Sequence, residues 1–214
     1  MTEADEAQLI ADATGGSVDA FEALYRLHSA RIYGLCVRLA DSRADAQDAT
    51  QETFIKAWRA LSDFRGGSAF STWLHRIAFN EVMGLKRKRT NERRHLEVVD
   101  NAAASGRTSL TETDALERAI AKLPERAREA LVLHKIYGYT HEETAGFMDT
   151  AVGTCKAQVH RAIQLLRESL PMSGTGDAPY DAEAGSTADV RTEPDTPDKA
   201  IPDHHIFGRA PWDE

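Results

Sequence analysis

The segment from Asp45 to Trp58, DAQDATQETFIKAW, decides the fold of this chain. At 100° per residue it separates its side chains into two helical faces. One face holds the small and apolar residues Ala46, Ala49, Thr53, Phe54, Ala57, Trp58 and, just beyond the segment, Leu61. The other holds the charged residues Asp45, Asp48, Glu52, Lys56 and Arg59. We therefore expect an amphipathic helix over about residues 43–61, with Phe54 and Trp58 in a core.

Helical patterns continue on both sides of this segment, and strand patterns are almost absent. Apolar residues recur at helical spacing over residues 17–40 and again over 71–89, and a short helix is possible before Gly15. The loop 62–68 contains two adjacent glycines, which break a helix. The sequence therefore predicts a helical domain over residues 1–94.

The rest of the chain divides by composition. Residues 95–112 are small and polar and are typical of a linker. Residues 113–171 are again helical, with breaks at Pro124 and Gly138. Residues 172–214 are rich in Gly, Pro, Ser, Thr and Asp and too poor in apolar residues to form a core. We predict an all-α fold of two small helical domains joined by a flexible linker, with a disordered acidic tail.

The second helical region contains the pattern of a helix-turn-helix. Thr140 and Glu143 fit a capping box, and Asp149 suits a tight turn. The next helix has an apolar stripe of Val152, Cys155, Val159, Ile163, Leu166 and Leu170. Its other face carries Thr154, Lys156, Ala157, Gln158, His160 and Arg161. A recognition helix reaches the major groove in this way; taken alone, the pattern also fits an ordinary helical hairpin with a solvated polar face.

Charge is distributed unevenly along the chain. The formal net charge is −8, of which residues 172–214 contribute −7 through ten acidic and three basic residues. The remainder is close to neutral, and its cations gather in the run 86–94, which has six cations and one anion. Because phosphate responds to local charge, this run is a candidate contact with nucleic acid.

Several other classes of function find no support in the sequence. Cys36 and Cys155 stand far apart within apolar helical patterns, which favours buried thiols, and His204 and His205 lack further ligands for a metal. We find no phosphate loop, nucleophile motif or metal set, so we expect neither an enzyme nor a cofactor. The acidic N-terminal residues lack the pattern of a signal peptide, and no apolar run is long enough to insert in a membrane, so we expect a cytoplasmic protein.

Three motifs in fixed order resemble one known family. DAQDATQETFIKAW resembles region 2.2 of bacterial RNA polymerase sigma factors, and FRGGSAFSTWLHRIAFNEVMGLKRKR is similar to their regions 2.3 and 2.4. YTHEETAGFMDTAVGTCKAQVHRAIQLLRESL is similar to region 4.2. The motifs span about 150 of the 214 residues, with no large segment between them. That arrangement resembles the small extracytoplasmic-function (ECF) group.

The resemblance implies two DNA contacts. The minus-10 strand would be held by Arg65, Gly67, Ser68, Phe70, Ser71, Trp73, Arg76, Asn80, Lys86, Arg87, Lys88 and Arg89. Trp73 could instead be a core residue that anchors the loop. The minus-35 duplex would be read by Thr140, Thr154, Lys156, Ala157, Gln158, His160 and Arg161. Thr144 and Cys155 stand where the family commonly has aliphatic residues, which weakens any transfer of sequence preference.

The resemblance also implies protein partners. Core RNA polymerase would bind through its beta-prime clamp helices and beta flap, with Asp45, Asp48, Gln51, Glu52 and Lys56 of this chain facing the clamp. An anti-sigma factor is a further expected partner. The expected function is promoter-specific transcription initiation. The alternatives are a stand-alone helix-turn-helix regulator, an enzyme, or a sigma-like interaction module without polymerase activity. The acidic tail either has no role or folds back onto a basic or helical surface.

Overall fold

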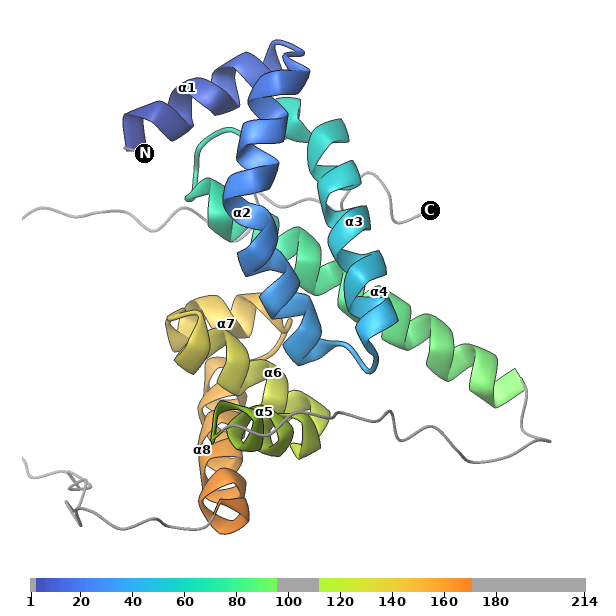
Figure 1. Ribbon diagram of the computed structural model, residues 1–214. Helices are drawn as coiled ribbons and strands as arrows, with labels where there is room; N and C mark the ends of the chain where they lie inside the picture. The colour runs from blue at the N-terminus through green and yellow to red at the C-terminus, as the bar shows by residue number, and fades with distance from the viewer. Residues whose placement is uncertain (1–2, 96–111, 171–214) are drawn as a thin grey trace, which may run out of the picture. The chain divides into compact units, whose positions relative to one another are not determined.

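A computed structural model of the chain describes residues 3–95 and 112–170. These residues form helices and no strand, which confirms the all-α prediction (Figure 1). In chain order the elements are α1 (Glu3–Thr14), α2 (Val18–Leu39), α3 (Arg43–Arg59), η1 (Leu61–Asp63), α4 (Phe70–His95), α5 (Glu112–Lys122), α6 (Glu125–Leu131), η2 (Val132–Ile136), α7 (His141–Phe147) and α8 (Val152–Ser169). Most of the predicted linker and the whole predicted tail lie outside the described residues.

Serine caps set the starts of two helices, α2 and α3, in the first block, residues 3–95. The Ser17 hydroxyl accepts a hydrogen bond from the backbone N–H of Ala20 at 3.2 Å, and the Ser42 hydroxyl accepts one from Asp45 at 3.1 Å. Each cap satisfies an amide that has no partner within its helix and contributes about 1 kcal/mol. The helices α2 and α3 therefore each begin one residue after a serine cap.

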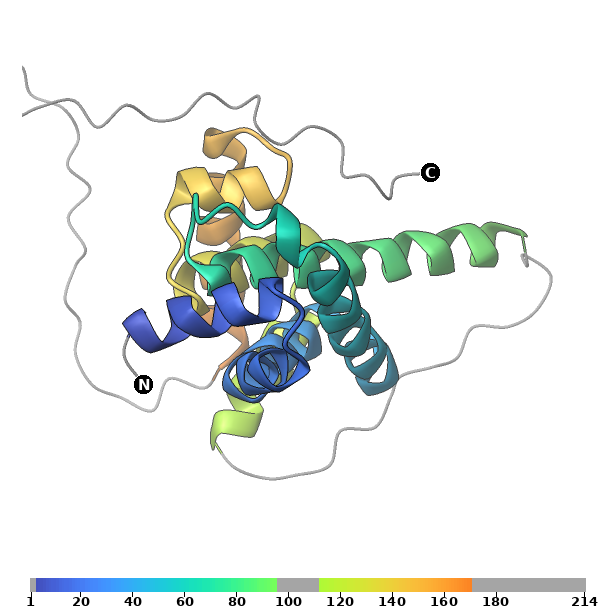
Figure 2. The ribbon, with the colours of Figure 1, turned by 90° about the horizontal axis from the view of Figure 1, so that it is seen from above.

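The first block is built around α2. This helix packs against α1, α3 and α4, and α3 packs against α4 (Figure 2). The side chains with almost no exposed surface are Leu24, Ile32, Leu35, Leu39, Leu74 and Val82. Burying a side chain of this size stabilises the folded state by roughly 1.5–3 kcal/mol. This shared core holds α3 and α4 together and thereby positions their outer faces.

Helix α4 is longer than the sequence pattern predicts. It runs from Phe70 to His95, six residues beyond the expected end at Arg89. The extension consists mainly of Arg, Glu and Asn, and it contains neither Gly nor Pro, so nothing in it breaks a helix. The basic run consequently lies on a helix and not in a loose arm.

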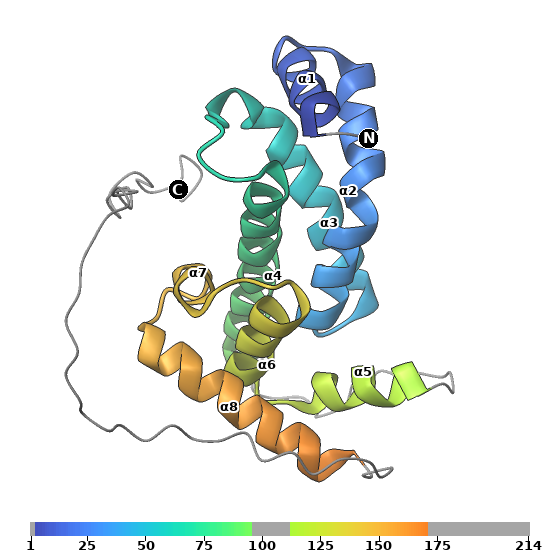
Figure 3. The same cartoon turned by 90° about the vertical axis from the view of Figure 1, so that its left-hand side faces the viewer.

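The second block, residues 112–170, is a set of short helices packed on α8. Figure 3 shows α8 crossing α6, with α7 near its N-terminal end, and both helices pack against it. Between α6 and α7 the chain forms one π-helical turn, in which the Tyr137 N–H donates to the Val132 carbonyl at 3.1 Å. Gly138 then adopts a φ of 78°, which ends the helix as predicted.

Candidate nucleic-acid and polymerase interfaces

Local hydrogen bonds build the helix-turn-helix of the second block. The Glu143 N–H donates to the Thr140 hydroxyl at 3.1 Å, and the Thr140 N–H donates to the Glu143 carboxylate at 2.8 Å. The predicted capping box is therefore confirmed. Asp149, with a φ of 47°, makes the turn into α8. A left-handed backbone costs Asp less than most residues, which explains its place in the turn.

Helix α8 presents its predicted recognition face to solvent. Cys155 and Val159 are buried against the other helices, as is Ala162, which the sequence pattern did not single out. The exposed residues on the outer face are Thr154, Lys156, Ala157, His160 and Arg161, and Gln158 is half-buried. Thr140 is also exposed. Every residue that we expected to meet the minus-35 duplex is thus at least partly accessible.

The loop before α4 combines exposed residues with an aromatic anchor. Arg65, Gly67 and Ser68 are exposed, and Ser71 is half-buried. Phe70, by contrast, is only 4% exposed. The expectation that Phe70 shapes a base pocket therefore does not match its position, because its ring is enclosed in the core.

Trp73 belongs to the cluster of aromatic rings around Phe70. The Phe70 ring centroid lies 5.3 Å from that of Phe64 and 5.5 Å from those of Trp73 and His28. Trp73 is partly buried and packs against the core. This position favours the loop-anchoring interpretation of Trp73 over direct base stacking.

The basic run of α4 divides into paired and exposed cations. Arg87 and Lys88 are exposed. Lys86 is buried, with its ammonium 2.9 Å from the Glu125 carboxylate, whose pKa it lowers. Arg89 forms an ion pair with Asp45. The expectation that all four cations are available to phosphate is therefore wrong for Lys86 in this structure, because a carboxylate from α6 already occupies it.

Two further candidate residues of α4, Asn80 and Arg76, also differ in whether the second block contacts them. The side chain of Asn80 is exposed. The Arg76 guanidinium lies over the Phe147 ring of α7, 5.1 Å from its centroid. A cation above an aromatic face is attracted by the negative charge of the ring surface. Asn80 can therefore meet a ligand directly, whereas Arg76 is engaged by the second block.

The polar face of α3 is smaller than predicted. Asp48 and Gln51 are exposed and Glu52 is half-buried. Asp45 is only 6% exposed, because its carboxylate accepts a hydrogen bond from Ser42 at 2.7 Å in addition to its ion pair with Arg89. Its expected place in an exposed polymerase contact is therefore wrong for this structure. The Lys56 ammonium, also predicted to face polymerase, lies 2.8 Å from the Glu81 carboxylate.

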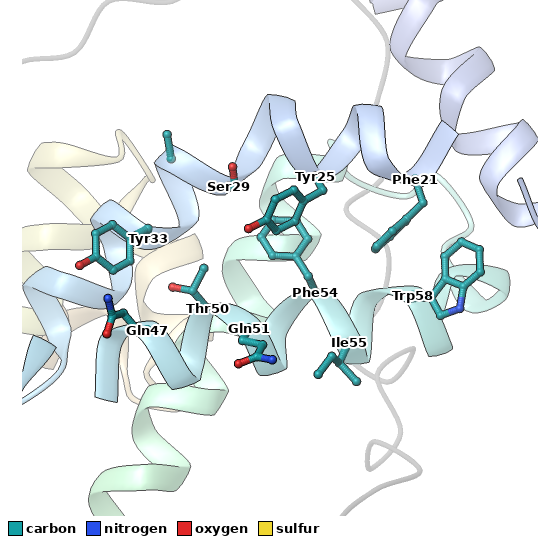
Figure 4. Close-up of a pocket in the computed structure, with 11 residues that line it drawn as sticks. Phe21, Tyr25, Ser29, Tyr33, Gln47, Thr50, Gln51, Phe54, Ile55 and Trp58 are labelled. Carbon is teal, nitrogen blue, oxygen red and sulfur yellow. The ribbon is translucent and has the colours of Figure 1, made fainter. Parts of the chain in front are cut away.

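An open groove runs between α2 and α3 (Figure 4). Its volume is about 840 Å³. Its lining residues are Phe21, Tyr25, Ser29, Ala30 and Tyr33 from α2, and Gln47, Thr50, Gln51, Phe54, Ile55 and Trp58 from α3. The polymerase-facing candidate Gln51 therefore belongs to an amphipathic groove that the sequence did not reveal.

Trp58 corrects the sequence prediction at one end of this groove. Its side chain is 38% exposed, and its ring lies 4.9 Å from that of Phe21. Phe54, in contrast, is buried as predicted and lies 4.7 Å from the ring of Tyr25, which is 44% exposed. Helical spacing placed Trp58 on the apolar side of α3, but only the position of α2 decides which part of that side is covered.

Metal-ligating side chains do not cluster in the described ranges. No group of three or more His, Cys, Asp or Glu side chains there could hold a metal ion. The rings of His134 and His141 stack at 3.9 Å, and burial raises the pKa of the nearby Cys155 thiol. Both cysteines are buried, as predicted. Among the described helices, none is long and apolar enough to cross a membrane.

Comparison with known proteins assigns both blocks. The family model described as Sigma-70 region 2 matches residues 24–92, and the one described as Sigma-70, region 4 matches residues 113–166. The RNA polymerase sigma-H factor of Pseudomonas aeruginosa is 34% identical over 185 residues, covering 79% of this chain and 96% of that protein. The ECF RNA polymerase sigma factor SigM of Mycobacterium tuberculosis is 34% identical over 176 residues, covering 81% and 89%.

Solved structures agree with this assignment. The sigma factor RpoE of Bartonella quintana, crystallised with the anti-sigma factor NepR, matches with a TM-score of 0.62 and 28% identity, covering 73% of this chain and all of that one. CnrH, in complex with the cytosolic domain of CnrY, matches with a TM-score of 0.54 and 27% identity over 77% of this chain and 96% of that one. Taken with the helix-turn-helix and the two matched regions, these similarities show that the chain belongs to the ECF group of RNA polymerase sigma factors.

Proposed function

We propose that this chain binds core RNA polymerase and directs it to promoters, reading the minus-35 element with α8 and capturing the melted minus-10 strand with α4 and the loop before it. The observation that carries the proposal is the outer face of α8. It is exposed along Thr154, Lys156, Ala157, His160 and Arg161 and belongs to a helix-turn-helix whose first helix begins with a capping box. On this proposal the chain carries out no covalent chemistry itself.

The contact with the minus-35 element follows from the chemistry of α8. A recognition helix meets base edges with residues near its N-terminus. Gln158 can pair with adenine, and Arg161 can pair with guanine or with phosphate. Lys156 adds a phosphate contact that positions the helix without reading sequence. Each good bidentate base contact contributes about 1–3 kcal/mol of discrimination.

The contact with the minus-10 strand uses a different principle. An unpaired base is recognised by its edges and faces once it leaves the stack. Arg65, Ser68 and Asn80 are accessible for such contacts, and Arg87 and Lys88 are accessible to phosphates. Capture of unpaired bases lowers the free energy of the open complex, so melting is favoured near a sequence that fits.

Docking on polymerase is assigned to α3 and the α2/α3 groove. Asp48 and Glu52 supply negative charge beside the groove, and Gln51, Ile55 and Trp58 supply polar and apolar surface within it. An interface with an apolar centre and a charged rim is typical of specific protein recognition. We propose that the clamp helices of the beta-prime subunit occupy this surface and that the beta flap contacts the second block.

An anti-sigma factor is proposed as a regulator. The solved complex of the sigma factor RpoE with the anti-sigma factor NepR supports this step, and the similar chain CnrH was also solved with a protein partner, the cytosolic domain of CnrY. A stand-alone helix-turn-helix regulator remains the alternative. It would bind duplex DNA through α8 but would have no affinity for core polymerase.

Run-off transcription with purified core polymerase tests the proposal. We expect specific transcripts from a promoter library only when the chain is present, and loss of those transcripts in the double variant D48K/E52K. The matched control E22K/E168K reverses two exposed charges that do not line the groove and should retain transcription. Duplex binding without any binding to core polymerase would refute the sigma-factor function and support the alternative.

A further inference from the structure

The second block packs against α2 and α4 of the first block. At the centre of the contact, His75 Nδ1 of α4 and the hydroxyl of Tyr139 share a hydrogen bond of 2.5 Å. His75 is 3% exposed and Tyr139 is 9% exposed. The Tyr137 ring meets the His75 ring edge-on at 4.8 Å. The buried core of the described residues is thus continuous between the two blocks.

The contact covers two cations of α4, Arg76 and Lys86, that the family resemblance assigns to the minus-10 strand. Phe147 of α7 lies 6.0 Å from Phe79 and beneath the guanidinium of Arg76, at 5.1 Å. Further along α4, Glu125 of α6 holds the Lys86 ammonium at 2.9 Å. A phosphate could pair with Lys86 only after Glu125 had left it. An aromatic ring from the second block likewise occupies one face of Arg76.

Polar pairs along α2 and in the turn that follows it complete the contact. The Arg38 guanidinium donates to the Glu117 carboxylate of α5 at 2.5 Å. The Tyr137 hydroxyl donates to the Arg31 carbonyl at 2.9 Å. Arg128 lies 3.8 Å from Asp41. Because these side chains are mostly half-buried or buried, their pairs are less screened by salt than pairs on an open surface.

We infer that this contact is autoinhibitory: the segment from α5 to α7 and the minus-10 strand compete for Arg76 and Lys86 of α4. The inference rests on the proposed function, since it concerns the site assigned to that strand. The outer face of α8 remains exposed in the closed chain, so the inhibition acts on strand capture and spares recognition of the duplex. Only open molecules bind the strand. The apparent affinity of the chain for single-stranded DNA is therefore the affinity of the open state multiplied by the fraction of molecules that are open.

The Arg38–Glu117 pair provides a test that leaves every proposed DNA and polymerase contact unchanged. R38E and E117R each break the pair, whereas the double variant R38E/E117R restores it with the charges exchanged. We would measure binding of a fluorescent single-stranded 12-nucleotide DNA of mixed sequence by anisotropy at fixed low salt. Amide hydrogen exchange over residues 137–147 would report the opening of the contact independently of DNA. E117Q serves as a milder variant should R38E fail to fold.

Opening of the contact and a direct effect of the changed charge on DNA binding predict different results. If the contact inhibits, both single variants bind the DNA about 5-fold or more tightly than the wild type, and the exchanged pair returns to the wild-type affinity. If charge alone acts, E117R binds more tightly and R38E more weakly, which would overturn the inference. Faster exchange in the single variants with unchanged DNA affinity would also overturn it. Neither result depends on the run-off assay, so failure of the proposed function is recognised separately.

Discussion

The two helices assigned to DNA, α8 and α4, differ in what limits their access to it. The recognition face of α8 is exposed, and the motif that presents it depends on hydrogen bonds between residues a few positions apart. On α4, Lys86 and Arg76 contact residues 39 and 71 positions further along the chain. The comparison shows that a local motif can expose its candidate binding residues by itself, whereas the exposure of candidate residues within a tertiary contact depends on the rest of the fold.

The largest expected effect concerns pH, which should act on the α4 contact and leave the α8 face unchanged. Burial, followed by the charges of Arg31 and His28, lowers the pKa of His75 to about 4. Unfolded His75 takes up a proton near pH 6.5, whereas the folded residue takes it up only near pH 4. Its contribution to the free energy of unfolding is therefore complete above pH 6.5 and declines as the pH falls toward 4, by on the order of 3 kcal/mol.

Denaturant unfolding at pH 7 and pH 4.5 would measure this effect. H75Q should lose the part of the pH dependence that His75 supplies, while H160Q, on the exposed face of α8, should keep the wild-type profile. An H75Q profile identical to that of the wild type would show that His75 does not carry the effect. Protonation of Glu125, whose pKa is also lowered, acts in the same direction but persists in both variants.

Reversal of the cations of α8 should have the next largest effect. In K156E/R161E, two favourable phosphate or base contacts become repulsive, and we expect promoter-specific transcription by the reconstituted holoenzyme to fall on the order of 100-fold. The control R26E/K122E reverses two exposed cations elsewhere and should change little. If the two double variants lost activity equally, the outer face of α8 would not be the duplex contact.

Reversal of the exposed cations of α4 should have a smaller and more selective effect. Arg87 and Lys88 act on phosphates without reading bases, so R87E/K88E should lower open-complex formation roughly 10-fold and flatten its salt dependence. A promoter already melted across its minus-10 element should show the same loss. If open-complex formation fell only on fully duplex templates, Arg87 and Lys88 would act in duplex binding and not in strand capture.

The smallest expected effect concerns the stability of the helix-turn-helix and not its recognition of DNA. Thr144 is fully buried, and its hydroxyl has no hydrogen-bond partner. T144V replaces that hydroxyl with a methyl group of similar size, so we expect the free energy of unfolding to rise by about 1 kcal/mol. Thermal unfolding would measure the gain, with T154V on the exposed face as the control. Destabilisation by T144V would mean that the hydroxyl is satisfied in solution.

Much of the fold could be predicted because its signals are local. The break at Gly138, the capping box at Thr140 and the turn at Asp149 were all recognisable from short patterns. The family was recognisable from three motifs in order. The end of α4 was not, because its last residues suit a helix and a solvated arm equally well.

The candidate sites were predictable only in part. Residue types identified α8, α3 and the basic run, but not which side chains within them are covered. Asp45 and Lys86 were expected at the surface and are buried in ion pairs, whereas Trp58 was expected in the core and is partly exposed. The α2/α3 groove joins Tyr25 and Gln51, which belong to different helices, and no spacing within either helix reveals it.

By itself, the sequence determined the helical class and the sigma-factor family, and it supplied the candidate residues for contact with DNA or polymerase. Helical periodicity and caps act over a few residues, so they can be identified along the chain. The tertiary structure alone decided which of those residues are accessible. Burial and ion pairing join residues far apart in sequence, and the partner of Lys86 follows from how α6 meets α4.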